Sequence, residues 1–445
     1  MRMVSRALLI IILSLSVFLG SSLAQGPSPE LKSQYDKAFA AMMADLTNPE
    51  LSFQFVKVAI EVGDLRGAIA ALERILLINP GLANIQLELG VLYLRVGNAE
   101  LAQDYLRKAI RAPGIPDAIR SRAERFLLIA EGGVTRHLFT GTLYLGGRYD
   151  SDANAAPASR NVLAGGQSAL LEERNTGRDD YSLVGVGNFR YIYALQDQAH
   201  NEIETNFFFV SQRYARSHEI DLGSINGDVG PRFYLGPVLN PDLSIRPFVS
   251  SSYLWLGDEH FLATYGGGVD FRKFFSNTLY GDARLSVAQQ NYQDSNLRPT
   301  VSDRTGPLLA LDGTVHYQLR PATLISGGLL YSRRFSKESF ESFNEGGFAV
   351  SVQQNYLDPL KWTEFDWSSS LSIAFSYTSY DRPDPVVDPN VRRKDPRTNI
   401  IFANNMRLTE ALTLIVTAQH TINNSNLPNF KFTNTSGTIG VAYRF

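Results

Sequence analysis

Histidine, aspartate, glutamate and serine are among the residue types in this chain that could act as metal ligands, acid–base groups or nucleophiles. The histidines are scattered, one to each predicted strand or loop, and none shows the spacing of metal ligands. No Gly-x-Ser-x-Gly motif is present, and the chain has no cysteine, which excludes disulfides and thiol chemistry. We therefore predict that the protein is not an enzyme and holds no metal or cofactor. The histidines are His137, His200, His218, His260, His316 and His420.

Arginines and carboxylates recur at alternate positions in the C-terminal two thirds of the chain, on the polar face of predicted strands. Glu364 and Asp366, two residues apart, project from the same face of one strand. In a barrel wall such charges line the lumen, where they tune what passes, bind a plug or form a cross-strand ion-pair network. His316, which shares a face with Asp312, is interpreted as a water-facing residue of a polar lumen. The candidate lumen-lining charges are Arg148, Arg190, Glu204, Arg246, Asp270, Arg272, Asp282, Arg284, Asp312, Glu364, Asp366 and Arg444.

From about Thr135 onward, apolar and polar residues alternate with a period of two, which predicts strands. In the segment 309–319, for example, Leu309, Leu311 and Val315 lie on one face of the predicted strand, and Asp312 lies on the opposite, polar face. A soluble β-sandwich also alternates in this way. Here, however, aromatic residues gather toward the strand ends of the apolar face, an arrangement typical of the girdles of transmembrane barrels.

The alternating segments predict about fourteen strands, and an even number suits a single-chain barrel. The connections between them alternate in length, from the two residues 321–322 to the long polar loops 151–180 and 381–397. Short turns of such barrels face the periplasm and long loops face outside. The predicted strands are 136–150, 181–194, 201–214, 219–235, 243–256, 260–274, 278–292, 306–320, 323–335, 345–356, 363–380, 398–408, 411–422 and 432–445.

The chain ends on an aromatic residue, Phe445, at the end of an alternating strand. A terminal aromatic carboxylate is typical of bacterial outer-membrane barrels, whose last strand pairs with the first to close the sheet. We therefore expect the strand 432–445 to pair with the strand 136–150, with Phe445 at the closure. Outer-membrane lipids and the barrel-assembly machinery are the expected partners of this part.

The N-terminal residues predict a secretory signal, in which Arg2 and Arg6 precede an apolar run and Ser22-Leu23-Ala24 offers a cleavage site. The later sequence has no run of about 20 apolar residues, so it would cross a membrane as a barrel or not at all. With a formal net charge of -2, the chain has no electrostatic footprint for nucleic acid.

Residues 25–133 show a helical period instead, and they contain a repeat of 34 residues. Val62-Gly63 recurs as Val96-Gly97, and Gly90 stands where the first helix of a tetratricopeptide repeat has a small residue. Such repeats form a solenoid with a concave groove for a polypeptide. A generic helical bundle is the alternative interpretation.

The predicted fold class is therefore α plus transmembrane β, with a helical domain followed by a roughly 14-stranded antiparallel outer-membrane β-barrel. The predicted organisation is a signal peptide at 1–24, a periplasmic tetratricopeptide-repeat-like helical domain at 25–133 and a C-terminal transmembrane β-barrel at 134–445. We expect the protein in the bacterial outer membrane, with the helical domain in the periplasm.

This order of parts resembles the surface lipoprotein assembly modifier family. The end of the first predicted strand adds a local match, since Ser151-Asp152-Ala153-Asn154-Ala155-Ala156-Pro157 is similar to the family's Ser-Asn-x-Asn-x-x-Pro stretch. Asp152 stands where asparagine is usual.

The resemblance implies a translocon-like protein that assists export or surface display of specific lipoproteins or secreted effector proteins. It also implies that the helical domain engages a periplasmic cargo protein or chaperone. The alternative is an exopolysaccharide-export porin, or another outer-membrane channel with a periplasmic tetratricopeptide domain, although such porins usually carry far more repeats.

Overall fold

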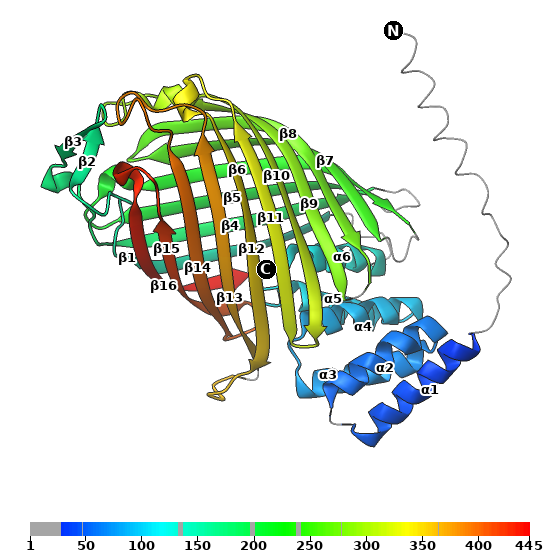
Figure 1. Cartoon of the computed structure of the whole chain (residues 1–445). Helices are drawn as coiled ribbons and strands as arrows, with labels where there is room; N and C mark the ends of the chain where they lie inside the picture. Colours follow the sequence, from blue (N-terminus) through cyan, green and yellow to red (C-terminus); the bar gives the residue numbers. More distant parts are fainter. Residues whose placement is uncertain are drawn as a thin grey trace, which may run out of the picture. The chain divides into compact units, whose positions relative to one another are not determined.

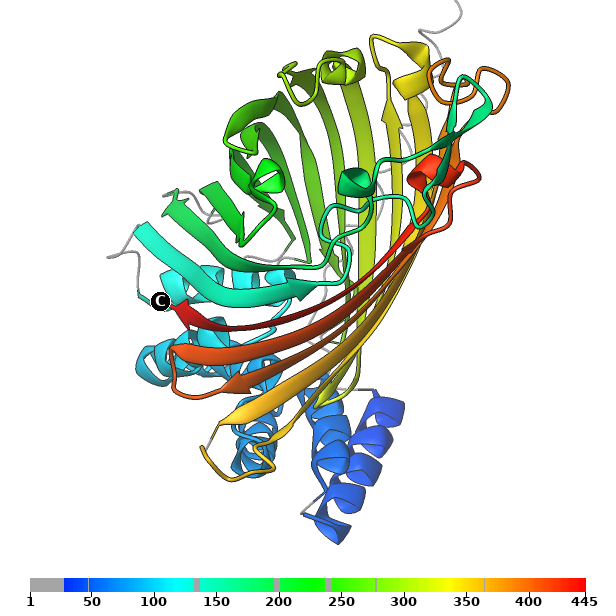
Figure 2. The same ribbon diagram turned by 90° about the vertical axis from the view of Figure 1, so that its left-hand side faces the viewer.

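The computed structural model describes residues 28–46, 48–131, 137–195, 201–236, 242–276, 278–363 and 365–445. Within these residues, helices α1–α6 precede a closed antiparallel barrel of 14 strands (Figure 1, Figure 2), which confirms the predicted fold class. The predicted signal segment 1–24 and the predicted domain boundary at residue 133 lie outside the described residues. The chain divides into two compact units, residues 1–71 and 72–445, and helices α4–α6 belong to the same unit as the barrel.

The helices repeat with the predicted spacing. The start of α4 at residue 83 lies 34 positions after the start of α2 at residue 49, and α5 follows α3 by the same interval. Gly63 and Gly97, equivalent in the repeat, both adopt left-handed backbone angles, with φ of 91° and 84°, which ends each first helix sharply. The helices are α1 Pro29–Ala44, α2 Pro49–Val62, α3 Leu65–Ile78, α4 Ala83–Arg95, α5 Ala99–Arg111 and α6 Asp117–Ala130.

Helices α4, α5 and α6 share one hydrophobic core with the barrel. A Cβ atom on Gly90 would lie 2.5 Å from Leu106 Cγ, so the small residue in α4 is what lets α5 approach closely. The same core includes Phe126 of α6 and Tyr280 of the barrel, both nearly inaccessible to solvent. These three helices are therefore part of the packed interior of the barrel's own unit.

The barrel strands occur where the alternating pattern predicts them. One hairpin was not predicted, and it consists of β2 (Asn161–Ala164) and β3 (Gln167–Leu170). The hairpin lies within the long connection 151–179, and Gly165 N donates to Val386 O (2.8 Å) in the connection 381–393. Its strands are too short to show a periodic pattern. The barrel strands are β1 His137–Asp150, β4 Asp180–Ala194, β5 Glu202–Tyr214, β6 Leu222–Leu235, β7 Leu243–Leu256, β8 Glu259–Phe274, β9 Leu279–Tyr292, β10 Gly306–Arg320, β11 Thr323–Arg334, β12 Phe343–Leu357, β13 Asp366–Tyr380, β14 Lys394–Arg407, β15 Leu412–Asn423 and β16 Phe432–Arg444.

Strand β16 closes the barrel by pairing with β1, from Thr142↔Arg444 to Asp150↔Ser436. Phe445 extends this ladder, because its carbonyl oxygen accepts from Gly141 N (3.0 Å) and its amide donates to Gly141 O (3.2 Å). Its ring covers Gly141, where a Cβ atom would lie 2.7 Å from the ring edge. The terminal residue thus completes both the hydrogen bonding and the packing of the seam.

The outer face of the barrel is apolar and exposed. On β12, for example, Phe348, Val350 and Val352 are exposed, while the residues between them are half-buried. Apolar residues exposed at alternate positions along a closed wall form the lipid-facing band of a transmembrane barrel. Among the described residues, no helix is long and apolar enough to cross a bilayer.

The two ends of the barrel differ in their connections. The short-turn end carries the connections 195–201, 236–242, 275–278, 321–322, 358–365 and 408–411. The long-loop end carries 151–179, 215–221, 257–258, 293–305, 335–342, 381–393 and 424–431. Because β1 starts at the short-turn end, α6, the helix before it, meets the barrel there.

Candidate functional site in the barrel lumen

Helix α6 closes the short-turn end of the barrel. It is buried along nearly its whole length, including polar side chains such as Ser121, Glu124 and Arg125. Thr140 on β1 donates to Glu124 Oε1 (2.9 Å), and the Arg125 guanidinium lies over the ring of Tyr234 on β6, 4.3 Å from its centroid. Polar residues of α6 are therefore paired with polar and aromatic groups of the barrel wall, as buried polar groups must be.

The segments before α6 complete the closure on the other side of the barrel. Arg444 on β16 donates to Ala112 O (2.6 Å), in the connection between α5 and α6. Arg111 forms an ion pair of 3.1 Å with Glu410, in the connection between β14 and β15. Contacts to β1, β6 and β16 thus hold α6 and the connection before it at the short-turn end of the barrel (Figure 2).

Asp117, the first residue of α6, links the helix to two strands. Its carboxylate lies 2.5 Å from Arg190 Nη2 on β4 and 3.0 Å from Arg272 Nη2 on β8. Desolvation in the barrel mouth would raise the pKa of Asp117, but the two guanidinium groups outweigh it and hold that pKa well below its ordinary value of 3.8. We call these three residues the α6 latch.

The pKa of Glu124, two turns further along α6, is shifted in the opposite direction. Its side chain is fully buried, and Arg190 Nη1 lies 3.3 Å from it. Burial raises the pKa of Glu124 above its ordinary 4.5, against the opposing charge of Arg190. Glu88 on α4 behaves in the same way, since burial raises its pKa although it pairs with Arg122 on α6 (3.2 Å).

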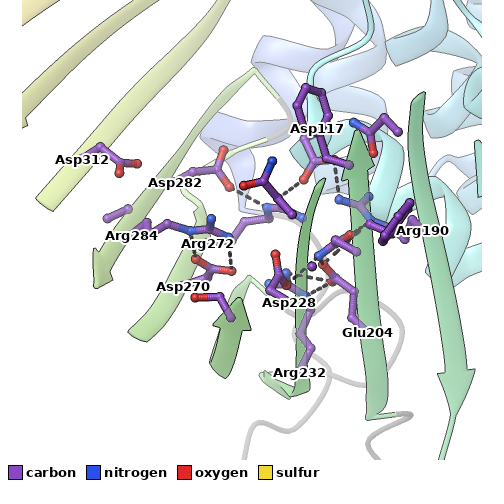
Figure 3. Close-up of a pocket in the computed structure, with 18 of the residues that line it drawn as sticks. Asp117, Arg190, Glu204, Asp228, Arg232, Asp270, Arg272, Asp282, Arg284 and Asp312 are labelled. Carbon is purple, nitrogen blue, oxygen red and sulfur yellow. Dashed lines mark hydrogen bonds and ion pairs between the residues drawn. The ribbon is translucent and has the colours of Figure 1, made fainter. Parts of the chain in front are cut away.

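The wall beside the latch holds a network of ion pairs that crosses neighbouring strands (Figure 3). Arg246, which is fully buried, pairs with Asp228 and with Asp270 (2.9 Å), and Arg284 binds Asp270 from the other side (2.6 Å). Arg232 likewise pairs with Glu204 (2.9 Å). Such a network stabilises the wall only because nearly every charge has a partner, and removing one would leave another uncompensated.

A cavity of about 710 Å³ lies inside the barrel, bounded at one end by Pro116 and Asp117. Acidic groups predominate on its wall, although arginines stand between them. Arg272 and Asp282, which form a pair of 2.6 Å, lie beside the start of α6. The charged and histidine residues lining the cavity are Asp117, Arg190, Glu204, Asp228, Arg232, Asp270, Arg272, Asp282, Arg284, Asp312 and His316.

Most of the candidate lumen charges meet in this cavity, but some lie elsewhere. Arg148 lies at the long-loop end, where it pairs with Asp150 (2.8 Å). Arg444 and Asp366 bind the segments that flank the helices, and neither lines the cavity. Glu364 lies outside the described residues. The candidates that line the cavity or pair with its wall are Arg190, Glu204, Arg246, Asp270, Arg272, Asp282, Arg284 and Asp312.

His316 faces the lumen as predicted, but its acidic neighbour is different. It lies 3.7 Å from Asp282 on β9 and stacks on Tyr280, with ring centroids 4.8 Å apart. Asp312 is four residues away on the same strand, which is about 13 Å of extended chain. Cross-strand neighbours are closer than that, so Asp282 rather than Asp312 becomes its partner.

Several residues of the site were not predicted from sequence. Asp228 and Arg232 lie on the polar face of a predicted strand, so their alternation could have identified them. Asp117 and Glu124 carried no such signal, because a charged residue on a helix normally faces solvent. Among the described residues, no group of three or more potential ligands could hold a metal ion.

Comparison with known proteins supports the sequence-based interpretation. Residues 232–445 match the model of a family described as surface lipoprotein assembly modifier. The match runs from the end of β6 through β16, and together with the closed barrel and the N-terminal helices it confirms the predicted resemblance. No curated protein matches the sequence.

Solved structures with a similar barrel include an anion-selective porin from Comamonas acidovorans (9% identity, 69% of this chain and 99% of the porin covered, TM-score 0.35). A second is a bacterial polysaccharide outer membrane secretin, with 10% identity, a TM-score of 0.37, and 68% of this chain and 98% of the secretin covered. A third is the outer membrane channel DcaP of Acinetobacter baumannii, with 8% identity, a TM-score of 0.38, and 69% of this chain and 97% of the channel covered. With such low TM-scores, these likenesses carry no inference about what this chain transports. The barrel and the family match support a transport role in the outer membrane.

Proposed function

Because this chain fits the surface lipoprotein assembly modifier family, we propose that it assists the export or surface display of specific lipoproteins or secreted effector proteins. The observation that carries the proposal is the family match over residues 232–445, within the barrel that α6 closes. In this proposal the short-turn end and the helices face the periplasm, and barrel-assembly machinery inserts the barrel.

The closed mouth gives the proposal a mechanism. A channel for small solutes needs a lumen open at both ends, whereas here buried helices cover one end and the α6 latch links α6 to two strands. Such a closure protects the outer membrane from leakage at rest. Cargo or a periplasmic chaperone that binds the helices would displace α6 and admit the substrate, because only differential binding to the open state can shift the equilibrium.

The test is a deletion strain, complemented with the wild-type gene as the control. Surface proteins are compared by protease treatment of intact cells followed by mass spectrometry. We expect at least one lipoprotein or secreted protein to disappear from the surface and accumulate in the periplasmic fraction. An unchanged set of surface and secreted proteins would reject the proposal, and loss of exopolysaccharide alone would favour the glycan-export alternative.

A further inference from the structure

A second cavity, of about 650 Å³, lies at the short-turn end between the helices and the start of β13. Its wall combines apolar and charged residues, and Leu77, at the end of α3, is 86% exposed. Asp366 and Gln86 line it, although their side chains are more than nine-tenths buried. We call this cavity the Asp366 groove, and its apolar wall consists of Leu76, Leu77, Pro80, Tyr105 and Phe365.

Two buried oxygen atoms in the Asp366 groove accept no hydrogen bond from any described residue. Gln86 Nε2 donates to Pro80 O (2.6 Å), and Asp366 Oδ2 accepts from Gly81 N (2.7 Å), so the two side chains bind opposite ends of one peptide group. The Pro80 contact requires the nitrogen of Gln86, which fixes the orientation of its amide. Gln86 Oε1 and Asp366 Oδ1 are left as unpaired acceptors.

The cations near these oxygens are already engaged. Arg407 donates to Thr409 O (3.2 Å) and Glu410 O (3.3 Å), and its guanidinium lies over Phe365, 4.8 Å from the ring centroid. Lys108, at the rim, pairs with Asp104 (2.8 Å). Buried acceptors without a donor are costly, so a ligand that supplies a donor here is favoured by more than its apolar contacts.

We infer that the Asp366 groove binds an extended polypeptide segment in which a lysine or arginine stands between apolar residues. On binding, the Asp366 and Gln86 side chains would turn toward the groove, so that the cationic group donates to Asp366 Oδ1 and Gln86 Oε1, atoms that are buried in the empty groove. The apolar side chains would cover Leu77 and its neighbours. The aliphatic part of the wall disfavours a hydroxyl-rich glycan, and the volume lies in the range of ligand pockets, about 300–1,000 Å³. This inference rests on the proposed function, since it places one cargo-binding site beside the closed mouth.

The test uses the purified full-length protein in detergent micelles and two fluorescein-labelled peptides, Ser-Leu-Leu-Lys-Leu-Leu-Ser and the same peptide with glutamate in place of lysine. Fluorescence anisotropy should show that the lysine peptide binds about tenfold more tightly. D366N should remove this preference, because it keeps the shape and the bond to Gly81 but not the charge. L77S should weaken both peptides without affecting folding, since Leu77 is 86% exposed.

E100Q and L101S, on the accessible side of α5, are the matched controls and should leave binding unchanged. Folding of every variant is checked by heat-modifiable migration in gels. Equal binding of both peptides by the wild-type protein, an unchanged preference in D366N, or displacement by maltohexaose would overturn the inference. Peptide binding is measured without export, so a protein that binds neither peptide yet supports export would refute the groove and leave the proposed function standing.

Discussion

At the scale of single residues, Asp117 connects the helical part to the barrel through the α6 latch. Its partners are 73 and 155 positions away in sequence, and they come from two different strands. More than half of its side chain is exposed to the cavity, so solvent screens both ion pairs in part. The latch therefore contributes a modest share of the free energy that holds α6 against the barrel, beside the burial of the helix itself.

We predict that D117N raises the ratio of open to closed channels about tenfold, from a loss of about 1–2 kcal/mol of docking free energy. Ion conductance in planar bilayers measures this ratio. D270N is the matched control, because Asp270 pairs with Arg246 and Arg284 in the wall and, among the described residues, forms no ion pair with a helix. Similar conductance changes in both variants would contradict the latch.

We also predict that channel conductance depends on pH, because the pKa values of Asp117 and Glu124 are shifted in opposite directions. Asp117 has a lowered pKa in the docked state, so its contribution to docking is complete above 3.8 and is lost as the pH falls further. Glu124 has a raised pKa, so acidification toward 4.5 first favours the docked state. Conductance should thus fall and then rise on acidification, and D117N should lose only the second, low-pH change.

At the scale of elements, the seam between β1 and β16 depends on the last residue of the chain. The ring of Phe445 packs against Phe139 and Phe189, with centroids 5.6 Å and 6.2 Å away, and against Tyr443 (5.9 Å). The ring covers Gly141, the residue with which Phe445 exchanges backbone hydrogen bonds. Side chain and backbone of one residue therefore hold the same end of the seam.

We predict that F445A lowers the free energy of barrel unfolding by about 1–2 kcal/mol, because several aromatic contacts across the seam are lost. Urea titration followed by heat-modifiable migration measures this change. F402A is the matched control, since Phe402 on β14 is also exposed on the lipid face (45%) but lies away from the seam. If F445A and F402A lowered the free energy of unfolding equally, the effect would come from lost lipid contact and not from the seam between β1 and β16.

At the scale of the whole molecule, the lengths of the connections predict how the barrel is oriented in the membrane. The long-loop end carries 151–179 and 381–393, and α6 meets the barrel at the short-turn end. Because the chain has no cysteine, a single introduced thiol reports the location of one site unambiguously.

We predict that a membrane-impermeant maleimide labels N390C on intact cells, because residue 390 lies in a long connection that should face outside. E100C, on α5, should be labelled only after the outer membrane is permeabilised. Labelling of E100C on intact cells, with N390C protected, would reverse the orientation and refute a periplasmic helical part.

The sequence by itself determined the barrel class, the number of wall strands and the strand that closes the wall. The class and the number of strands follow from a period of two and from turn lengths, and the closing strand follows from the aromatic residue Phe445 at the end of the last strand; all of these are local properties of the chain. It also identified most charges of the lumen, since alternation assigns each residue of a strand to one face.

Only the tertiary structure decided that helices α4–α6 pack with the barrel, that α6 covers one mouth, and that Asp366 and Arg444 bind the flanking segments instead of the cavity. The physical reason is that helical periodicity marks which face of α6 is apolar but not what lies against it. Asp117 and Glu124 look like solvated helix residues until arginines from distant strands are placed beside them.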